Sequence, residues 1–242
     1  MQGIVKINRQ DVEISYSVAV NFTEATMAIN SRIFKNWKNS LSRKFKISHI
    51  FIQAVDFRGE ATAKNVLFIR MKVTCANLLY PAVVELRGNT VVMLPIIDVD
   101  GEIFTVLVRQ PRIATGKIAL PELPAGMIDN GTFSGAAARE LYEELGLVVG
   151  QKELIDMTEN LPASANGIYF SPGMLDEKAK FYMIKLVMTR KKMQELQNKI
   201  TGVANEGEKI TLQILQLRLL SSVIQDGKSF IALALYHQLG YK

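Results

Sequence analysis

Strand-forming segments dominate the first half of the chain, where short β-branched and aromatic runs are separated by turns. The separators Arg58-Gly59-Glu60 and Asp98-Val99-Asp100-Gly101 have the polar, glycine-containing composition of turns. The strands predicted in this way cover residues 48–55, 66–75, 81–97 and 103–109, with one or two more in residues 1–20. In the second half, strand-like stretches near residues 147–149, 179–189 and 210–217 alternate with helical segments.

Helical periodicity marks four segments. Thr23 has the chemistry of an N-cap, so we expect a helix over residues 24–42. A charged helix is predicted over residues 190–199, and an apolar one over 226–239. The fourth contains Arg139-Glu140-Leu141-Tyr142-Glu143-Glu144-Leu145-Gly146, which the alanines before it favour as a helix and which Gly146 ends.

This fourth helix carries a cluster of carboxylates. Glu140 and Glu144 lie one turn apart on one face with Glu143 beside them, at roughly 5–6 Å between Cβ atoms. Like charges this close repel, and a bound cation relieves the repulsion; oxygen ligands alone suit Mg²⁺ or Mn²⁺. A solvated acidic helix face is the alternative, because glutamate is simply a good helix former.

The residues before the helix favour the cation. Leu123-Pro124-Ala125-Gly126 is a turn, followed by a loop and then the carboxylates. Together these segments resemble the signature of the Nudix hydrolases, with Gly126 as its first glycine and Arg139, Glu140, Glu143, Glu144 and Gly146 in its second half. The loop is one residue short, and Thr132 stands where that signature has its early glutamate.

The resemblance implies an α+β Nudix fold, a mixed β-sheet in an α/β/α sandwich. Residues 1–88 are expected to form a β-rich N-terminal extension that contributes to dimerisation and to the substrate pocket, and residues 89–242 the catalytic domain. By the same resemblance the protein is expected to be a homodimer.

The resemblance also implies roles for the carboxylates. Glu140, Glu143 and Glu144, with the Ala125 carbonyl, would hold Mg²⁺ or Mn²⁺, and Arg139 would orient them. Glu144 is therefore counted among the catalytic residues. Glu206 and Glu208, on either side of Gly207, resemble the acidic loop that carries the catalytic base, and either could be that base. Without the resemblance, the alternative that both are ordinary solvated loop glutamates would be at least as good.

Other segments resemble the ADP-ribose and ADP-sugar diphosphatase branch, and residues 30–60 most resemble its plant-type members. Arg109 and Arg112 flank Pro111 and would bind diphosphate oxygens, although either could be an ordinary ion-pair partner. Glu177 lies in Ser171-Pro172-Gly173-Met174-Leu175-Asp176-Glu177, which resembles a loop bordering the site in that branch. The predicted reaction is metal-dependent hydrolysis of a nucleotide sugar to a nucleoside monophosphate and a sugar phosphate.

Composition adds limits rather than a function. The net charge is +6, and six cations between Arg32 and Lys46 form a basic run without an acid. Thr132 in place of the expected glutamate leaves open a second hypothesis, a catalytically weak Nudix-fold binding or regulatory module. The basic run could link such a module to nucleic acid, but a solvated helix face is favoured for the run and nucleic acid is not the expected partner. A single cysteine, Cys75, fits a reducing compartment. We read no membrane span, secretory signal or organelle address, and expect an intracellular, by default cytoplasmic, protein.

Overall fold

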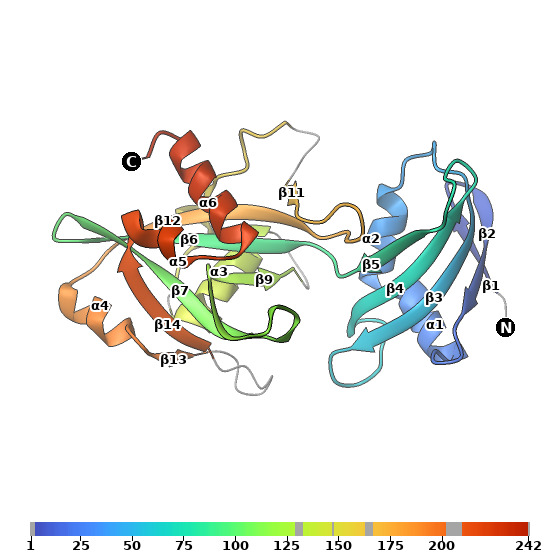
Figure 1. The fold of residues 1–242 in the computed structure, drawn as a ribbon, viewed down its shortest axis with the longest axis horizontal. Coiled ribbons are helices and arrows are strands. Elements are labelled where there is room, and N and C mark those ends of the chain that lie inside the picture. Colours follow the sequence, from blue (N-terminus) through green and yellow to red (C-terminus); the bar gives the residue numbers. More distant parts are fainter. Residues whose placement is uncertain (1–2, 129–132, 147, 163–166, 202–209, 242) are drawn as a thin grey trace. The chain divides into compact units, whose positions relative to one another are not determined.

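The computed structural model describes residues 3–128, 133–146, 148–162, 167–201 and 210–241. The chain forms two compact units (Figure 1). Unit 1 comprises Met1–Asn89 and Tyr169–Lys178, and unit 2 comprises Thr90–Ile168 and Ala179–Lys242. The predicted α+β class is confirmed, since each unit combines a sheet with helices. Among the described residues, no helix combines the length and apolarity needed to cross a membrane.

Unit 1 is built on a five-stranded sheet in the order β1-β2-β3-β4-β5. Its strands are β1 (Gly3–Ile7), β2 (Gln10–Tyr16), β3 (Ile47–Phe57), β4 (Val66–Cys75) and β5 (Ala82–Leu86). β2 and β3 pair in parallel and the other pairs are antiparallel. The helices α1 (Phe22–Asn30) and α2 (Arg32–Ser40) pack on the sheet through a core that includes Ala28, Phe34, Ile50 and Met71.

The single helix predicted over residues 24–42 is wrong, because Ser31 divides it. Ser31 has an extended backbone (φ −66°, ψ 159°) and caps α2 by accepting a hydrogen bond from Phe34 N at 3.3 Å. The predicted cap Thr23 is also wrong: Asn21 caps α1 and forms a reciprocal capping box with Glu24. The serine side chain offers the backbone an alternative to continued helix, which apolar periodicity alone does not reveal.

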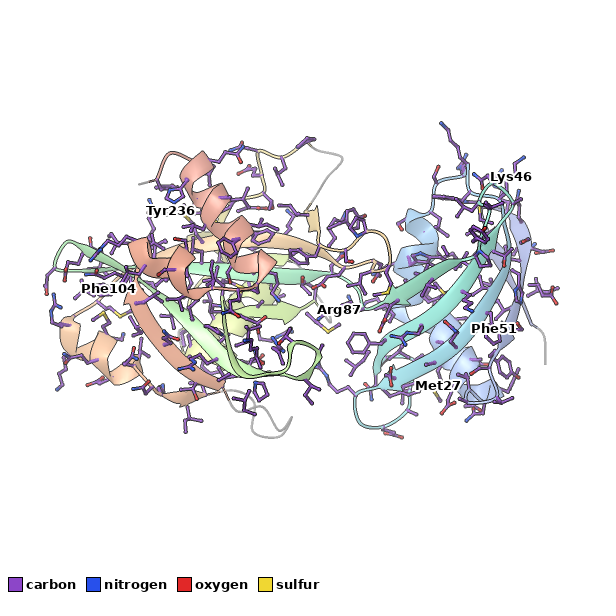
Figure 2. The ribbon with its side chains drawn as sticks, viewed as in Figure 1. Met27, Lys46, Phe51, Arg87, Phe104 and Tyr236 are labelled. Atoms are coloured by element: carbon purple, nitrogen blue, oxygen red, sulfur yellow. The ribbon has the colours of Figure 1, made fainter. Side chains whose placement is uncertain are left out.

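A late segment, Tyr169–Lys178, returns to unit 1 instead of staying with the domain predicted over residues 89–242. Glu85 N donates to Met174 O at 2.9 Å, which attaches the segment to β5. Asp176 Oδ1 accepts hydrogen bonds from Arg87 N (2.7 Å) and Gly88 N (3.1 Å). Glu177 Oε2 lies 3.1 Å from Nη1 of Arg87, which is labelled in Figure 2. The Arg87 guanidinium lies over the Phe68 ring, 5.8 Å from its centre.

Unit 2 is built on a nine-stranded mixed sheet in the order β10-β12-β6-β7-β14-β13, with β11 on β12, β8 on β7 and β9 on β6. Its strands are β6 (Thr90–Val99), β7 (Glu102–Arg112), β8 (Lys117–Glu122), β9 (Ala125–Met127), β10 (Ile155–Asp156), β11 (Ile168–Tyr169), β12 (Lys178–Val187), β13 (Ile200–Thr201) and β14 (Ile210–Gln216). Its helices are α3 (Phe133–Leu145), α4 (Arg190–Leu196), α5 (Leu220–Val223) and α6 (Gly227–Gln238), with short 3₁₀ turns at Ile113–Thr115, Gln151–Glu153 and Leu217–Leu219. β6 and β12 are parallel, which makes the sheet mixed.

The strand β6 is buried on both faces. Val91, Met93 and Ile97 share a core with Ala137 and Leu141 of α3, whereas the alternate residues of β6 face the other side. There α6 packs on β6, so helices cover both faces of the sheet (Figure 1). This is the predicted α/β/α sandwich.

Two strand predictions need correction. The strand expected over residues 81–97 is two strands, because Gly88 has φ +84° and interrupts the chain between β5 and β6. Residues 148 and 149, the described part of the strand expected near 147–149, are not a strand. There Gly146 ends α3 in the left-handed conformation (φ +69°), and its N–H donates to Tyr142 O at 2.8 Å.

Asp176 provides a test of how the late segment is attached to unit 1. Burial raises the pKa of this carboxyl, and the two backbone N–H groups only partly oppose that shift. Asp176→Asn keeps an oxygen for both N–H groups and removes the buried charge, so unit 1 should stay within about 1 kcal/mol of wild type at neutral pH. Asp176→Ala leaves both N–H groups without this acceptor and should cost roughly 1–3 kcal/mol.

Urea denaturation followed by fluorescence of Trp37, the single tryptophan, reports on unit 1. A raised pKa means that the fold penalises the carboxylate, so wild type should gain stability relative to Asp176→Asn as the pH falls through that pKa. A relative loss on acidification would show instead that the charged form is the one stabilised.

Candidate functional site

The turn before α3 is held on the central strand of unit 2. Ala125 and Gly126 lie in β9 opposite Val92 and Val91 of β6. Met93 N donates to Pro124 O at 2.9 Å, which continues the attachment toward the proline. The backbone that precedes α3 is therefore fixed by hydrogen bonds to a buried strand.

The helix α3 divides its faces as the sequence predicts. Ala136, Ala137, Leu141 and Leu145 are buried in the core shared with β6 and β7. The backbone positions of Glu140, Glu143 and Glu144 fall on the remaining surface, at helical spacings of three and four. The Glu143 side chain is about one-third exposed; the side chains of Glu140 and Glu144 lie outside the described residues.

Arg139 joins the helix to the turn. Its Nη2 donates to Met127 O at 3.2 Å, directly after β9 residues Ala125 and Gly126. Its Nε lies 3.8 Å from Glu143 Oε2, one helical turn along α3. One guanidinium thus touches both the turn that contains Ala125 and a carboxylate of the cluster, a suitable arrangement for orienting Glu143.

The donor set of α3 fits a hard divalent cation. Three carboxylates at helical spacing with a nearby backbone carbonyl offer oxygen ligands only, as Mg²⁺ and Mn²⁺ prefer. Among the side chains that the structure describes, no group of three or more metal-binding residues is found. Glu140 and Glu144 are not among those side chains, so the fit rests on the spacing along α3.

The predicted base residues Glu206 and Glu208, and the misfit Thr132, lie outside the described residues. The strands that flank residues 202–209 are described, however: β13 and β14 pair with Thr201 opposite Ile210. β13 also contacts α3, and a Cβ on Gly146 would come within 3.3 Å of Lys199 Nζ. Both ends of the acidic loop are therefore anchored on a hairpin beside α3.

The two arginines predicted to bind substrate differ in their surroundings. Arg109 is exposed on β7, and among the described residues it has no ion-pair partner. Its neighbour Val108 lies in the core that α3 covers. Because successive side chains of a strand point to opposite faces, Arg109 lies on the face of β7 opposite to α3. Arg112 Nε instead donates to Glu122 Oε2 at 2.6 Å, and Lys228 Nζ lies 3.2 Å from the other oxygen of this buried carboxylate.

Glu122 and Lys228 were not singled out from the sequence. Glu122 is 3% exposed, and its two cations come from β7 and from the first turn of α6. In the sequence Glu122 is an acid between Pro121 and Leu123 in an apolar stretch. Ser229, also buried, accepts a hydrogen bond from Leu123 N at 3.0 Å and holds the next residue of the same turn.

Glu177, the third predicted substrate contact, is buried in unit 1 and paired with Arg87. The structure thus brings Ala125, Gly126, Arg139, Glu143 and Gly146 into one region around α3. It gives Arg112 and Glu177 partners within the protein.

A model of the NUDIX domain matches residues 86–226. "Nudix hydrolase 14, chloroplastic" of Arabidopsis thaliana is 31% identical over 242 residues, covering 94% of this chain and 77% of that protein. "Putative nudix hydrolase 2" of Caenorhabditis elegans is 39% identical over 95 residues, 39% of this chain and 38% of that protein.

Among solved structures, one titled "Crystal structure of ADP compounds hydrolase" aligns with a TM-score of 0.48 and 19% identity, over 83% of this chain and 96% of that one. The domain match spans more than half of the chain, and the plant relative covers nearly all of it. The chain belongs to the Nudix hydrolase family.

Proposed function

We propose that this Nudix hydrolase cleaves the diphosphate of a nucleoside diphosphate sugar, of the ADP-ribose or ADP-glucose type, in a reaction that depends on Mg²⁺ or Mn²⁺. The observation that carries the proposal is the link through Arg139, which connects the turn after Ala125 to Glu143 on α3. The products would be a nucleoside monophosphate and a sugar phosphate.

Glu140, Glu143 and Glu144, with the Ala125 carbonyl, would hold the cations. Bound there, divalent ions would neutralise charge on the diphosphate and lower the pKa of a coordinated water. Arg139 holds the Glu143 carboxylate in place, and its bond to Met127 O fixes the helix against the turn. Preorganised ligands of this kind avoid reorganisation during the reaction.

Glu206 or Glu208 would accept the proton of the attacking water. The support is the position of the flanking strands, because β13 contacts α3 and pairs with β14. A loop whose two ends are fixed beside the carboxylate helix would keep a base near the reacting water. The sequence leaves the choice between the two glutamates open.

The substrate class rests on the sequence segments that resemble the ADP-sugar branch. Arg109 is the better of the two predicted arginine contacts, since its guanidinium is exposed and has no ion-pair partner among the described residues. Arg112 is held by Glu122 and Glu177 by Arg87, and a role in binding substrate would have to compete with those pairs. Homodimer formation stays a prediction from the resemblance.

The first test of the proposal is hydrolysis of ADP-ribose and ADP-glucose with Mg²⁺, with products identified by mass. Glu144→Gln removes a charged ligand without changing side-chain size, so turnover should fall by more than about 100-fold. Glu195→Gln, which makes the same change on the exposed face of α4, serves as the control and should match wild type. Negligible turnover by wild type itself would support the alternative, a binding module whose departure at Thr132 reflects lost catalysis.

Alanine variants of the two arginines should differ in effect, one on substrate binding and the other on protein stability. Arg109→Ala should raise the KM for the nucleotide sugar about 10- to 100-fold, the effect of losing one charge-assisted contact, with an unchanged unfolding midpoint. Arg112→Ala leaves Lys228 as the remaining cationic partner of the buried Glu122 carboxylate. The free energy of unfolding should therefore fall by roughly 1–3 kcal/mol. Steady-state kinetics and thermal unfolding of both variants check this, and a stability loss in Arg109→Ala with an unchanged KM would reverse the assignment.

A further inference from the structure

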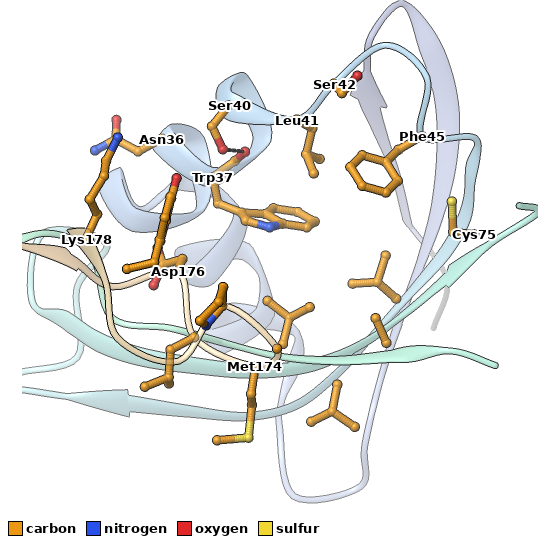
Figure 3. Close-up of a pocket in the computed structure, with 18 of the residues that line it drawn as sticks. Asn36, Trp37, Ser40, Leu41, Ser42, Phe45, Cys75, Met174, Asp176 and Lys178 are labelled. Atoms are coloured by element: carbon orange, nitrogen blue, oxygen red, sulfur yellow. Dashed lines mark hydrogen bonds between the residues drawn. The ribbon is translucent and has the colours of Figure 1, made fainter. Parts of the chain in front are cut away.

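Unit 1 contains a cavity of about 540 Å³, and none of the residues that line it has been given a role in the proposed reaction. It opens between α2, the loop after α2, the strands β4 and β5, and the segment Tyr169–Lys178, all of which belong to unit 1 (Figure 3). Its volume falls within the roughly 300–1,000 Å³ of small-molecule sites.

The interior of the cavity is apolar and its walls are aromatic. Ile47, Val73 and Val84 line it from the strands. Trp37 and Phe45 extend toward those strands from α2 and from the loop that follows it (Figure 3), and Tyr169 adds a third ring from the late segment. Rings of this kind favour a flat, unsaturated ligand, which they contact face-on or edge-on.

Large apolar side chains remain exposed around the opening. Phe45 is 41% exposed, Leu78 47%, Val83 41%, Tyr169 50% and Met174 42%, and all five line the cavity. Solitary exposed apolar residues are ordinary, but a group gathered at one concave opening is typical of a binding site.

The charged groups at the opening favour an anion. Lys178 Nζ lies 5.4 Å from the centre of the Tyr169 ring, and among the described residues no carboxylate is within ion-pair distance of it. Arg43, Lys44 and Lys46 flank Phe45 and are exposed. Of these four cations only Lys178 lines the cavity, so its ammonium is the group available there to an anionic ligand.

The acids nearby are already engaged within the protein. Asp176 lines the cavity but directs Oδ1 at the backbone N–H groups of Arg87 and Gly88. Its neighbour Glu177 is paired with Arg87. Neither acid is paired with Lys178, and the amides of Asn36 and Asn89 complete the polar rim.

We infer that unit 1 has a second ligand site, which binds a planar aromatic organic anion. The ring system lies among Trp37, Phe45 and Tyr169, and the anionic group lies at the Lys178 ammonium. This site goes beyond the proposed hydrolysis: it needs neither the α3 carboxylates nor a metal, and a failure of either function leaves the other intact.

The test uses a pair of dyes with the same aromatic skeleton and different charge. Anilinonaphthalene sulfonate is anionic, and N-phenylnaphthylamine is its neutral counterpart. Both are titrated in EDTA, without substrate, and binding is read as energy transfer from Trp37, the one tryptophan of the chain, which lines the cavity. Both dyes should accept energy from Trp37 at one site.

Lys178→Met should lower the affinity for the sulfonate dye by at least about tenfold and the affinity for the neutral dye by less than about twofold. Lys178→Arg should restore sulfonate binding, and Lys72→Met, an exposed lysine of β4 that does not line the cavity, should change neither dye. Val84→Phe, which fills the interior of the cavity, should lower the affinity for both dyes.

Three results would overturn the inference. They are no energy transfer from Trp37 to either dye, an equal loss of affinity for both dyes in Lys178→Met, and wild-type affinity for both dyes in Val84→Phe. A dye affinity that falls as the protein self-associates in sedimentation would also overturn it. That result would show that a second copy of the chain, not a small anion, occupies the opening.

Discussion

The burial of β6 on both faces is the constraint on which unit 2 depends. Nine of its ten residues, Thr90–Val99, are buried and only Asp98 is partly exposed, so neither face can be left to water and a helix must cover each. α3 covers one face through Ala137 and Leu141, and α6 packs on the strand as well. The same strand pairs with β9. Covering β6 therefore places both the turn at Ala125 and the carboxylate helix, and Arg139 joins them.

The sequence predicted best what local chemistry determines. Alanines and leucines at helical spacing defined α3, Gly146 marked its end with φ +69°, and α6 begins at Gly227, one residue after the predicted start of the helix over residues 226–239. Short polar residues that interrupt a periodic run were harder to interpret. Ser31 divides the predicted helix because its side chain caps α2, and Gly88 divides the predicted strand. In both cases one residue outweighed the hydrophobic pattern around it.

Partners distant in sequence could not be predicted from pattern alone. Glu122 is held by Arg112 and by Lys228, which is 106 residues away, and Glu177 by Arg87, at a separation of 90. A charge on a loop has the same appearance in sequence whether it meets substrate or an internal counter-ion. Tyr169–Lys178 likewise joins unit 1 through bonds to Glu85, Arg87 and Gly88, and thereby completes the cavity beside Trp37.

The central claim is that the α3 carboxylates bind a divalent cation, and a Mn²⁺ titration followed by electron paramagnetic resonance tests it most directly. Wild type should remove Mn²⁺ from the free-ion signal without substrate, and Glu140→Gln with Glu144→Gln should weaken this uptake by more than about tenfold. Glu195→Gln, the same change on the exposed face of α4, should not weaken it. Equal uptake by the double variant and wild type would contradict the account, because the cation would then bind somewhere other than α3.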